Sequence, residues 1–148
     1  MPEFIDPSAP GDCIFCKLVA GQIPSARVWE DDLTLAFMDL GQVNPGHVLV
    51  ATKRHAATLF DTTEDEAAAV MRVAWRLARA ARAAFDPEGL NLFQANGQVA
   101  EQTVNHFHLH VLPRNSGDGL LLTWPRPEPG AEALQRYAGQ LRQALNGN

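Results

Sequence analysis

Three histidines alternate with apolar residues in the last third of the chain, and this alternation constrains the fold more than any other feature. His106, His108 and His110 are spaced by two within the segment HFHLHVL (106–112). Side chains two positions apart on a β-strand share one face, so the spacing predicts a strand with three imidazoles on one side. The apolar residues that alternate with them then supply core on the opposite side.

A long amphipathic helix is predicted in the middle of the chain. Thr63 and Glu66 have the spacing of a capping box, and the helix should end near Phe85, before the Asp86-Pro87 pair. The arginines of this segment fall on one side, which we interpret as a solvated surface. The apolar residues at helical spacing on the other side are Val70, Val73, Ala74, Leu77 and Ala81.

Short strands account for most of the remaining pattern. They are predicted at 27–30, 33–39, 47–52, 89–95 and 106–112. A short helix or turn is expected at 12–20, an irregular arm at 113–129 and a final helix at 131–145. A strand-rich order with one long helix favours an α+β fold with an antiparallel sheet over a doubly wound α/β fold.

Length and charge set the class of protein. The 148 residues suit one domain, which we place at 12–148 with a C-terminal arm, after a flexible N-terminal lead at 1–11. Acids and prolines stand where a signal peptide needs a basic start, and the apolar runs are too short for a membrane span, so we expect a cytoplasmic protein. A net charge of −5 without a basic run argues against nucleic acid or membrane partners.

The histidine row by itself leaves three interpretations open. The imidazoles are solvent-facing or individually bonded side chains, or they bind a metal, or they carry out nucleophilic and acid–base catalysis. One zinc-dependent pattern of this kind, HxHxDH, needs an aspartate that is absent here. A neutral imidazole can attack phosphorus directly, whereas a neighbouring imidazolium can protonate the leaving group.

A CxxC pair near the N-terminus suggests a metal site. Cys13 and Cys16 are the only cysteines, and the βαβ pattern that a redox pair of the thioredoxin type requires is missing. Two cysteines and two histidines complete a tetrahedral zinc site. Spacing alone does not decide which histidines join them, since His47 and His55 are also available.

Taken in order, several segments resemble the histidine triad (HIT) family, and its bacterial Hint-like branch most closely. The similarity runs from Cys13 to about Trp124. The segments are CIFCKLVAGQIPSARVWEDD, LAFMDL, NPGHVLVATKRH, NLFQANG and QTVNHFHLHVLPR. The resemblance implies a five-stranded antiparallel sheet with one long helix and short terminal helices, and a homodimer. It also implies a nucleotide hydrolase or nucleotidyl transferase that acts at the α-phosphate.

The resemblance also implies roles for individual residues. His108 would be the nucleophile and would form a covalent nucleotidyl-histidine intermediate that water hydrolyses. His110 would contact the phosphate and leaving group, and His47 would support the triad. The other nucleotide-binding positions would be Asp39 and Leu40 at the ribose and Asn96, Gln102 and Thr103 at the phosphate. The ligands of a structural Zn²⁺ would be Cys13, Cys16, His55 and His106.

Two positions differ between this chain and parts of the family. Glu101 stands where most members have glycine, which brings a carboxylate near the phosphate loop. The third histidine of the triad, His110, is a glutamine in the uridylyltransferase branch, which favours hydrolysis over transfer. The expected substrate is a purine nucleoside phosphoramidate or a dinucleoside polyphosphate. The alternatives are a nucleotide-binding regulatory homodimer with negligible turnover and a zinc-dependent hydrolase whose triad binds the metal.

Overall fold

The computed structural model describes residue 6 and residues 8–147. The predicted N-terminal lead, 1–11, therefore lies partly outside the described residues. Within it, Asp6 pairs with the chain just before the histidine row. Its amide donates to Thr103 O over 2.6 Å, and its carbonyl accepts from Asn105 N over 2.9 Å. This pairing fastens the segment ahead of the CxxC pair to the polar loop at 96–105.

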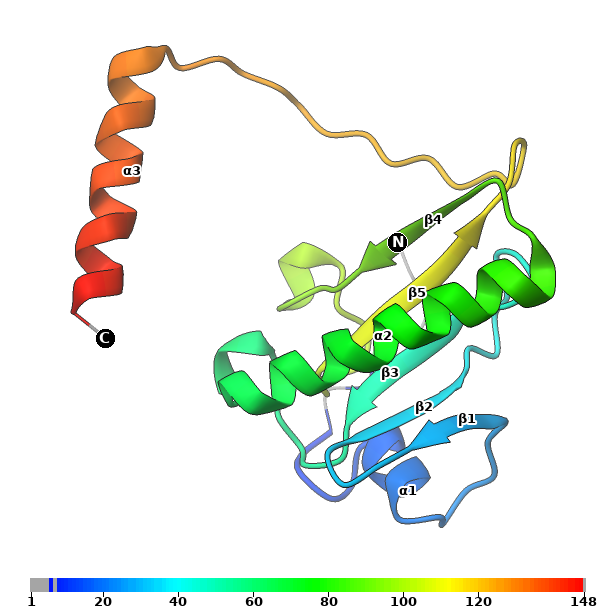
Figure 1. Cartoon of the computed structure of the whole chain (residues 1–148). Coiled ribbons are helices and arrows are strands. Elements are labelled where there is room, and N and C mark those ends of the chain that lie inside the picture. Colours follow the sequence, from blue (N-terminus) through cyan, green and yellow to red (C-terminus); the bar gives the residue numbers. More distant parts are fainter. Residues whose placement is uncertain (1–5, 7, 148) are drawn as a thin grey trace.

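Five strands form one antiparallel sheet (Figure 1). The strand order is β1-β2-β3-β5-β4, and every neighbouring pair is antiparallel. The expected α+β class with a five-stranded antiparallel sheet is confirmed. The strands are β1 (Arg27–Glu30), β2 (Thr34–Met38), β3 (Val48–Thr52), β4 (Gly89–Phe93) and β5 (His108–Arg114).

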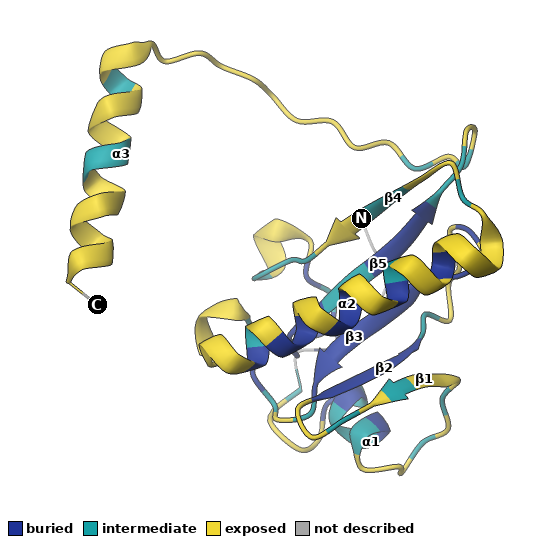
Figure 2. Cartoon of the chain, viewed as in Figure 1, coloured by how far each residue is buried: buried dark blue, intermediate teal, exposed yellow. Residues whose placement is uncertain are grey.

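The long helix α2 (Glu64–Phe85) covers one face of the sheet. Its capping box forms as predicted, with Thr63 accepting from the Glu66 amide over 3.1 Å and Glu66 accepting from the Thr63 amide over 2.8 Å. Figure 2 shows its buried side against the sheet and its exposed side outward. The buried residues that α2 contributes to this core are Val70, Val73, Ala74 and Leu77.

The opposite face of the sheet is covered by the short helix α1 (Ile14–Val19) and carries His108 and His110. His108 lies beside Ala51, and His110 lies beside Leu49, in the register of β3 and β5. Because alternate strand residues face opposite sides, Val111 packs under α2 while the two histidines face α1. The predicted division of the alternating segment into an imidazole side and a core side is confirmed for β5.

The start of β5 differs from the predicted strand. The alternation placed it at His106, whereas pairing with β3 begins at His108. His106 N donates instead to Val104 O over 2.8 Å, and Phe107 N donates to Ala56 O over 2.6 Å. These bonds turn the chain into the sheet, so the first histidine of the row lies ahead of the strand and in a different environment from the other two.

A long arm follows the sheet and ends in α3 (Ala131–Asn146). Residues 121–130 are exposed, and α3, among the described residues, has no fully buried side chain. Figure 1 shows α3 standing clear of the sheet. Among the residues that the structure describes, no helix is both long and apolar enough to cross a membrane.

Candidate active site and metal centre

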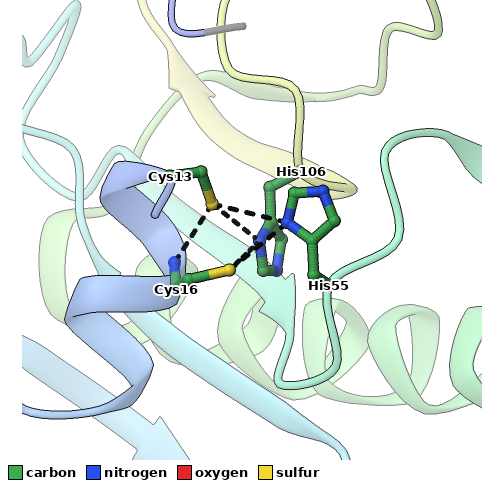
Figure 3. Close-up of side chains that lie close together, drawn as sticks. All are labelled: Cys13, Cys16, His55 and His106. Atoms are coloured by element: carbon green, nitrogen blue, oxygen red, sulfur yellow. Dashed lines mark hydrogen bonds between the residues drawn. The ribbon is translucent and has the colours of Figure 1, made fainter. Parts of the chain in front are cut away.

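Two sulfurs and two imidazole nitrogens converge between α1 and the loops that flank β3 and β5 (Figure 3). Cys13 Sγ lies 3.3 Å from His106 Nδ1 and 3.5 Å from His55 Nδ1. Cys16 Sγ lies 3.3 Å from His55 Nδ1 and 3.5 Å from His106 Nδ1. Zinc bound tetrahedrally by sulfur at about 2.3 Å and nitrogen at about 2.0–2.1 Å separates such atoms by about 3.5 Å. The four residues fit a zinc ion.

The hydrogen bonds around this cluster orient its ligands. His106 Nε2 lies 2.7 Å from Thr52 O, so Nε2 carries the hydrogen and Nδ1 presents its lone pair to the sulfurs. Burial lowers the pKa of His106 to about 4, which keeps the ring neutral. Burial also raises the pKa of the Cys13 thiol to about 11. Coordination by zinc would remove that thiol proton.

One hydrogen bond from a ring nitrogen of His108 fixes the tautomer of this imidazole. Its Nδ1 lies 2.7 Å from His106 O, and a carbonyl can only accept, so Nδ1 carries the hydrogen. Nε2 therefore holds a lone pair. Phe15 packs edge-on against the ring, with centroids 4.9 Å apart, and burial lowers the pKa of His108 below its ordinary value. The ring is a neutral imidazole with a defined nucleophilic nitrogen.

His110, His47 and Asp39 form a second polar group next to His108. His47 Nε2 lies 2.9 Å from His110 Nδ1 and 3.4 Å from Asp39 Oδ2. Burial lowers the pKa of His47, although the Asp39 carboxylate opposes that shift. Burial, with His108 and His47 nearby, lowers the pKa of His110 to about 3. Both imidazoles are therefore neutral at pH 7 in the free protein.

The turn before β3 holds His47 in place. The Gln42 amide nitrogen donates to Asp39 O over 2.6 Å and to His47 O over 2.7 Å, and its oxygen accepts from the amides of Gly46 and His47. Asn44 Nδ2 donates to Pro113 O over 2.8 Å, which ties the turn to the end of β5. The turn thus sets the distance between Asp39 and His47.

A cavity of about 480 Å³ lies on the α1 side of the sheet in front of the histidines. Among the predicted site residues it brings together Asp39, Leu40, Thr103, His108 and His110. His47 does not line the cavity, but it contacts His110, which does. Most of the remaining wall is apolar and is formed by Ile14, Phe15, Leu18, Ile23, Pro24, Phe37, Met38, Leu49 and Val104.

Asn96 and Gln102 lie in the polar loop but do not line this cavity. The Gln102 oxygen accepts from Gly97 N over 2.7 Å, and its nitrogen donates to Ala57 O over 2.6 Å and to Val104 O over 3.0 Å. Asn96 Oδ1 accepts from Leu59 N over 2.7 Å. Both side chains therefore brace the loop in the structure.

Glu101 ends the 3₁₀ helix η2 (Gln98–Ala100) and is exposed. Its φ of +69° lies in the left-handed region that glycine adopts without a steric penalty. A glycine, which the family resemblance leads one to expect at this position, would adopt this conformation without strain. The carboxylate does not line the cavity, so its charge is kept away from the pocket wall.

Sequence reasoning missed two residues that shape the site. Phe15 forms the wall beside His108, and Gln42 braces the turn that carries His47. Phe15 stands between the two cysteines in the expected helix or turn at 12–20. Its position next to the predicted metal ligands is the one signal in the sequence that could have marked it as a site residue. Gln42 belongs to no motif or periodic pattern in the sequence, so no local signal marks it.

The family model for the HIT domain matches residues 20–117. The chain belongs to the HIT family. Protein hit of Bacillus subtilis is 45% identical to it over 114 residues, which cover 76% of this chain and 79% of that protein. The adenosine 5'-monophosphoramidase hnt1 of Schizosaccharomyces pombe is 38% identical over 114 residues, which cover 76% of this chain and 83% of that protein.

Solved HIT structures agree with the fold. A HIT family protein from Bacillus anthracis matches with a TM-score of 0.88 at 40% identity, covering 92% of this chain and 99% of that chain. A zinc-bound histidine triad family protein from Mycobacterium smegmatis matches with a TM-score of 0.70 at 38% identity, covering 90% of this chain and 97% of that chain. The predicted membership of the HIT family is confirmed.

Proposed function

We propose that this HIT protein is a nucleotide hydrolase that cleaves at the α-phosphate of a purine nucleoside phosphoramidate or dinucleoside polyphosphate. The observation that carries the proposal is the 2.7 Å bond from His108 Nδ1 to His106 O, which leaves Nε2 as a nucleophile facing a nucleotide-sized cavity. Relatives named as adenosine 5'-monophosphoramidases support a phosphoramidate of adenosine as the first substrate to test.

The reaction proceeds in two displacements. His108 Nε2 attacks the α-phosphorus, the bond from phosphorus to the leaving nitrogen or oxygen breaks, and a nucleotidyl-His108 forms. The imidazole then carries positive charge, which the acceptor at His106 O stabilises through the Nδ1 hydrogen. Water attacks the same phosphorus and gives a proton to His110, which lost one to the leaving group; the bond to Nε2 breaks, and the nucleoside monophosphate and neutral His108 are released.

His110 and His47 supply the proton relay in this proposal. A hydrogen on His47 Nε2 can be donated to His110 Nδ1 over 2.9 Å, which leaves the hydrogen of His110 on Nε2. His110 is neutral in the free protein, because its pKa is about 3. A bound phosphate adds negative charge beside it and raises that pKa, so that the ring can protonate the leaving group.

The cavity suggests how the nucleotide is held. Asp39 accepts hydrogen bonds from the ribose hydroxyls, and Leu40 lies against the sugar. The purine occupies the apolar part of the wall, beside residues such as Phe15 and Ile23. Thr103 donates to the phosphate, while Asn96 and Gln102 contribute by fixing the loop that carries it.

A structural Zn²⁺ at Cys13, Cys16, His55 and His106 is part of the proposal. The four ligand atoms have separations that suit a tetrahedral ion, and the site is shielded by α1. When bound, zinc would link α1 to the loops that precede β5 and follow β3. It would take no part in the displacement steps, since His108 Nε2 is the attacking atom.

We further propose that the protein acts as a cytoplasmic homodimer. The outer side of α2 and the edge strand β4 leave large apolar side chains exposed, and a second copy would cover them. Light scattering after gel filtration should give twice the 16.2 kDa of one chain. The exposed residues concerned are Met71, Trp75, Phe85, Leu92 and Phe93.

Intact-protein mass spectrometry during turnover tests the chemistry. Wild type, His108→Gly and the surface control Glu64→Gln are mixed with an adenosine phosphoramidate and quenched in mild base, in which a phosphohistidine survives. We expect an added AMP mass on wild type and on the control, and none on His108→Gly. AMP binding without adduct or AMP release would favour the regulatory binding protein instead. If AMP is released without an adduct, and this release depends on added zinc, the result would favour a metal-bound water as the nucleophile.

A further inference from the structure

One carboxylate and two imidazoles direct a ligand atom each to a common point beside the nucleophile. His47 Nε2 lies 2.9 Å from His110 Nδ1, and Asp39 Oδ2 lies 3.4 Å from the first nitrogen and 3.9 Å from the second. Atoms bound to one ion at about 2.0–2.2 Å are about 2.8–3.6 Å apart for octahedral or tetrahedral angles. Two of the three separations match, and the third exceeds the range by a few tenths of an ångström.

The carboxylate is oriented for this geometry by its own hydrogen bonds. Asp39 Oδ1 accepts from Gly41 N over 3.0 Å, which leaves Oδ2 facing the imidazoles. Asp39 N donates to His47 O over 3.1 Å, so the backbone fixes the spacing of these two ligands. Metal ligands in proteins are held by outer hydrogen bonds of this kind.

The cluster is reachable from solvent, and it shares no ligand residue with the centre formed by Cys13 and Cys16. The side chains of Asp39 and His110 are 26% and 24% exposed, and both line the cavity. The His47 side chain is only 7% exposed and closes the back of the cluster. An ion can therefore enter from the cavity and keep water on its open side.

We propose that Asp39, His47 and His110 form a second metal site, which takes a divalent transition ion such as Zn²⁺. Two imidazoles and one carboxylate on one side of an ion suit zinc, cobalt and iron, whereas magnesium and calcium prefer all-oxygen sites. When the ion binds, the hydrogen that His47 Nε2 shares with His110 Nδ1 moves to His47 Nδ1, while His110 keeps its own hydrogen on Nε2, so both facing nitrogens donate lone pairs. No proton needs to leave the protein.

The consequence for catalysis rests on the proposed function. The ion would occupy the atoms assigned there to the ribose and to the proton relay. Metal and nucleotide then exclude each other, and the ion is a competitive inhibitor. Binding of the ion itself does not depend on that function.

Cobalt spectroscopy on the full chain tests the site. The protein first receives one equivalent of Zn²⁺, which the two thiolates should hold, and is then titrated with Co²⁺. We expect one further equivalent with weak d–d bands and no thiolate-to-cobalt charge-transfer band. Asp39→Asn should weaken that binding at least about tenfold, because it removes the only anionic ligand. Asp32→Asn, an exposed acid in the β1–β2 hairpin, should leave it unchanged.

Three results would overturn the second site. These are no cobalt beyond the first equivalent of metal, cobalt that appears only with a thiolate band, and equal binding by wild type and Asp39→Asn. Added AMP should weaken cobalt binding by wild type. If AMP has no effect while Asp39→Asn still weakens cobalt binding, the metal site stands and the proposed ribose contact fails.

Discussion

The main-chain carbonyl of His106 accepts the Nδ1 hydrogen of His108 over 2.7 Å, while the imidazole of His106 faces both cysteine sulfurs. One residue thus serves two sites: its side chain belongs to the candidate zinc centre, and its backbone selects the tautomer of the candidate nucleophile. Any movement of His106 is passed directly to His108.

Removing zinc should therefore destabilise the protein. Its rate of hydrolysis should fall as a secondary effect. A strong chelator should lower Tm by about 9 °C, since a loss of about 3 kcal/mol of stability shifts Tm by roughly 3 °C for each kcal/mol in a chain of this size. Added Zn²⁺ should restore it. Cys16→Ser is the matched control, because it lacks a zinc ligand. Its Tm should already be as low as that of chelated wild type, and the chelator should not change it. Unchanged Tm in chelated wild type would contradict a structural role for the metal.

Asp39→Asn should remove the recognition of ribose. A charged acceptor for a hydroxyl contributes about 1.5–3 kcal/mol, so kcat/KM for an adenosine phosphoramidate should fall about 10- to 100-fold. The 2'-deoxyadenosine substrate should already be slow with wild type and should change little in the variant. Steady-state kinetics on both substrates checks this, with Asp32→Asn as control. Equal losses on both substrates would argue against contact with the 2'-hydroxyl.

Glu66 gives α2 a pH-dependent anchor. Arg54 bonds to both of its oxygens over 2.7 Å, and this pairing lowers the pKa of Glu66 from 4.5 to about 2. The folded pKa is depressed, so the stabilisation is complete above about pH 4.5 and is lost as pH falls toward 2. Glu66→Gln should cost about 1–3 kcal/mol at pH 7 in urea unfolding and progressively less below pH 4.5. Glu64→Gln, exposed in the same turn, should show neither effect.

Gly46 should tolerate no side chain. Its φ is +99°, and an added Cβ would lie 2.7 Å from Phe85 Cδ2 and 3.2 Å from Pro113 Cγ. Gly46→Ala should cost about 2–4 kcal/mol from backbone strain and overpacking, and it should lower kcat by moving His47. Gly117→Ala has a similar φ of +74° with open space around its Cβ, so it isolates the strain alone. Similar losses in both variants would mean that the collision with Phe85 is relieved cheaply.

The sheet and α2 were predictable because their signals are local. Alternation along His108–Arg114 and the Thr63–Glu66 capping box depend only on residues a few positions apart. The start of β5 was not predictable in this way. His106 continues the alternation in sequence, but its amide and that of Phe107 bond to residues outside any strand.

The candidate site was predictable as a set of residues and not as a geometry. The triad spacing and the resemblance named the cysteines and histidines that converge in Figure 3. Neither the spacing nor the resemblance revealed that the Gln102 side chain forms hydrogen bonds with Gly97, Ala57 and Val104. Such bonds join positions up to 45 residues apart, and no local pattern encodes them.

The last strand of the sheet ends at Arg114, and its partner there is Gly89. Every strand, both helices that cover the sheet and all four residues of the candidate zinc centre therefore precede the arm in the order of synthesis. At about 5–20 residues per second, the ribosome makes the segment after residue 114 only once the whole sheet and the candidate site are in the nascent chain. The arm and α3 then arrive as an addition to a unit whose interior is already specified.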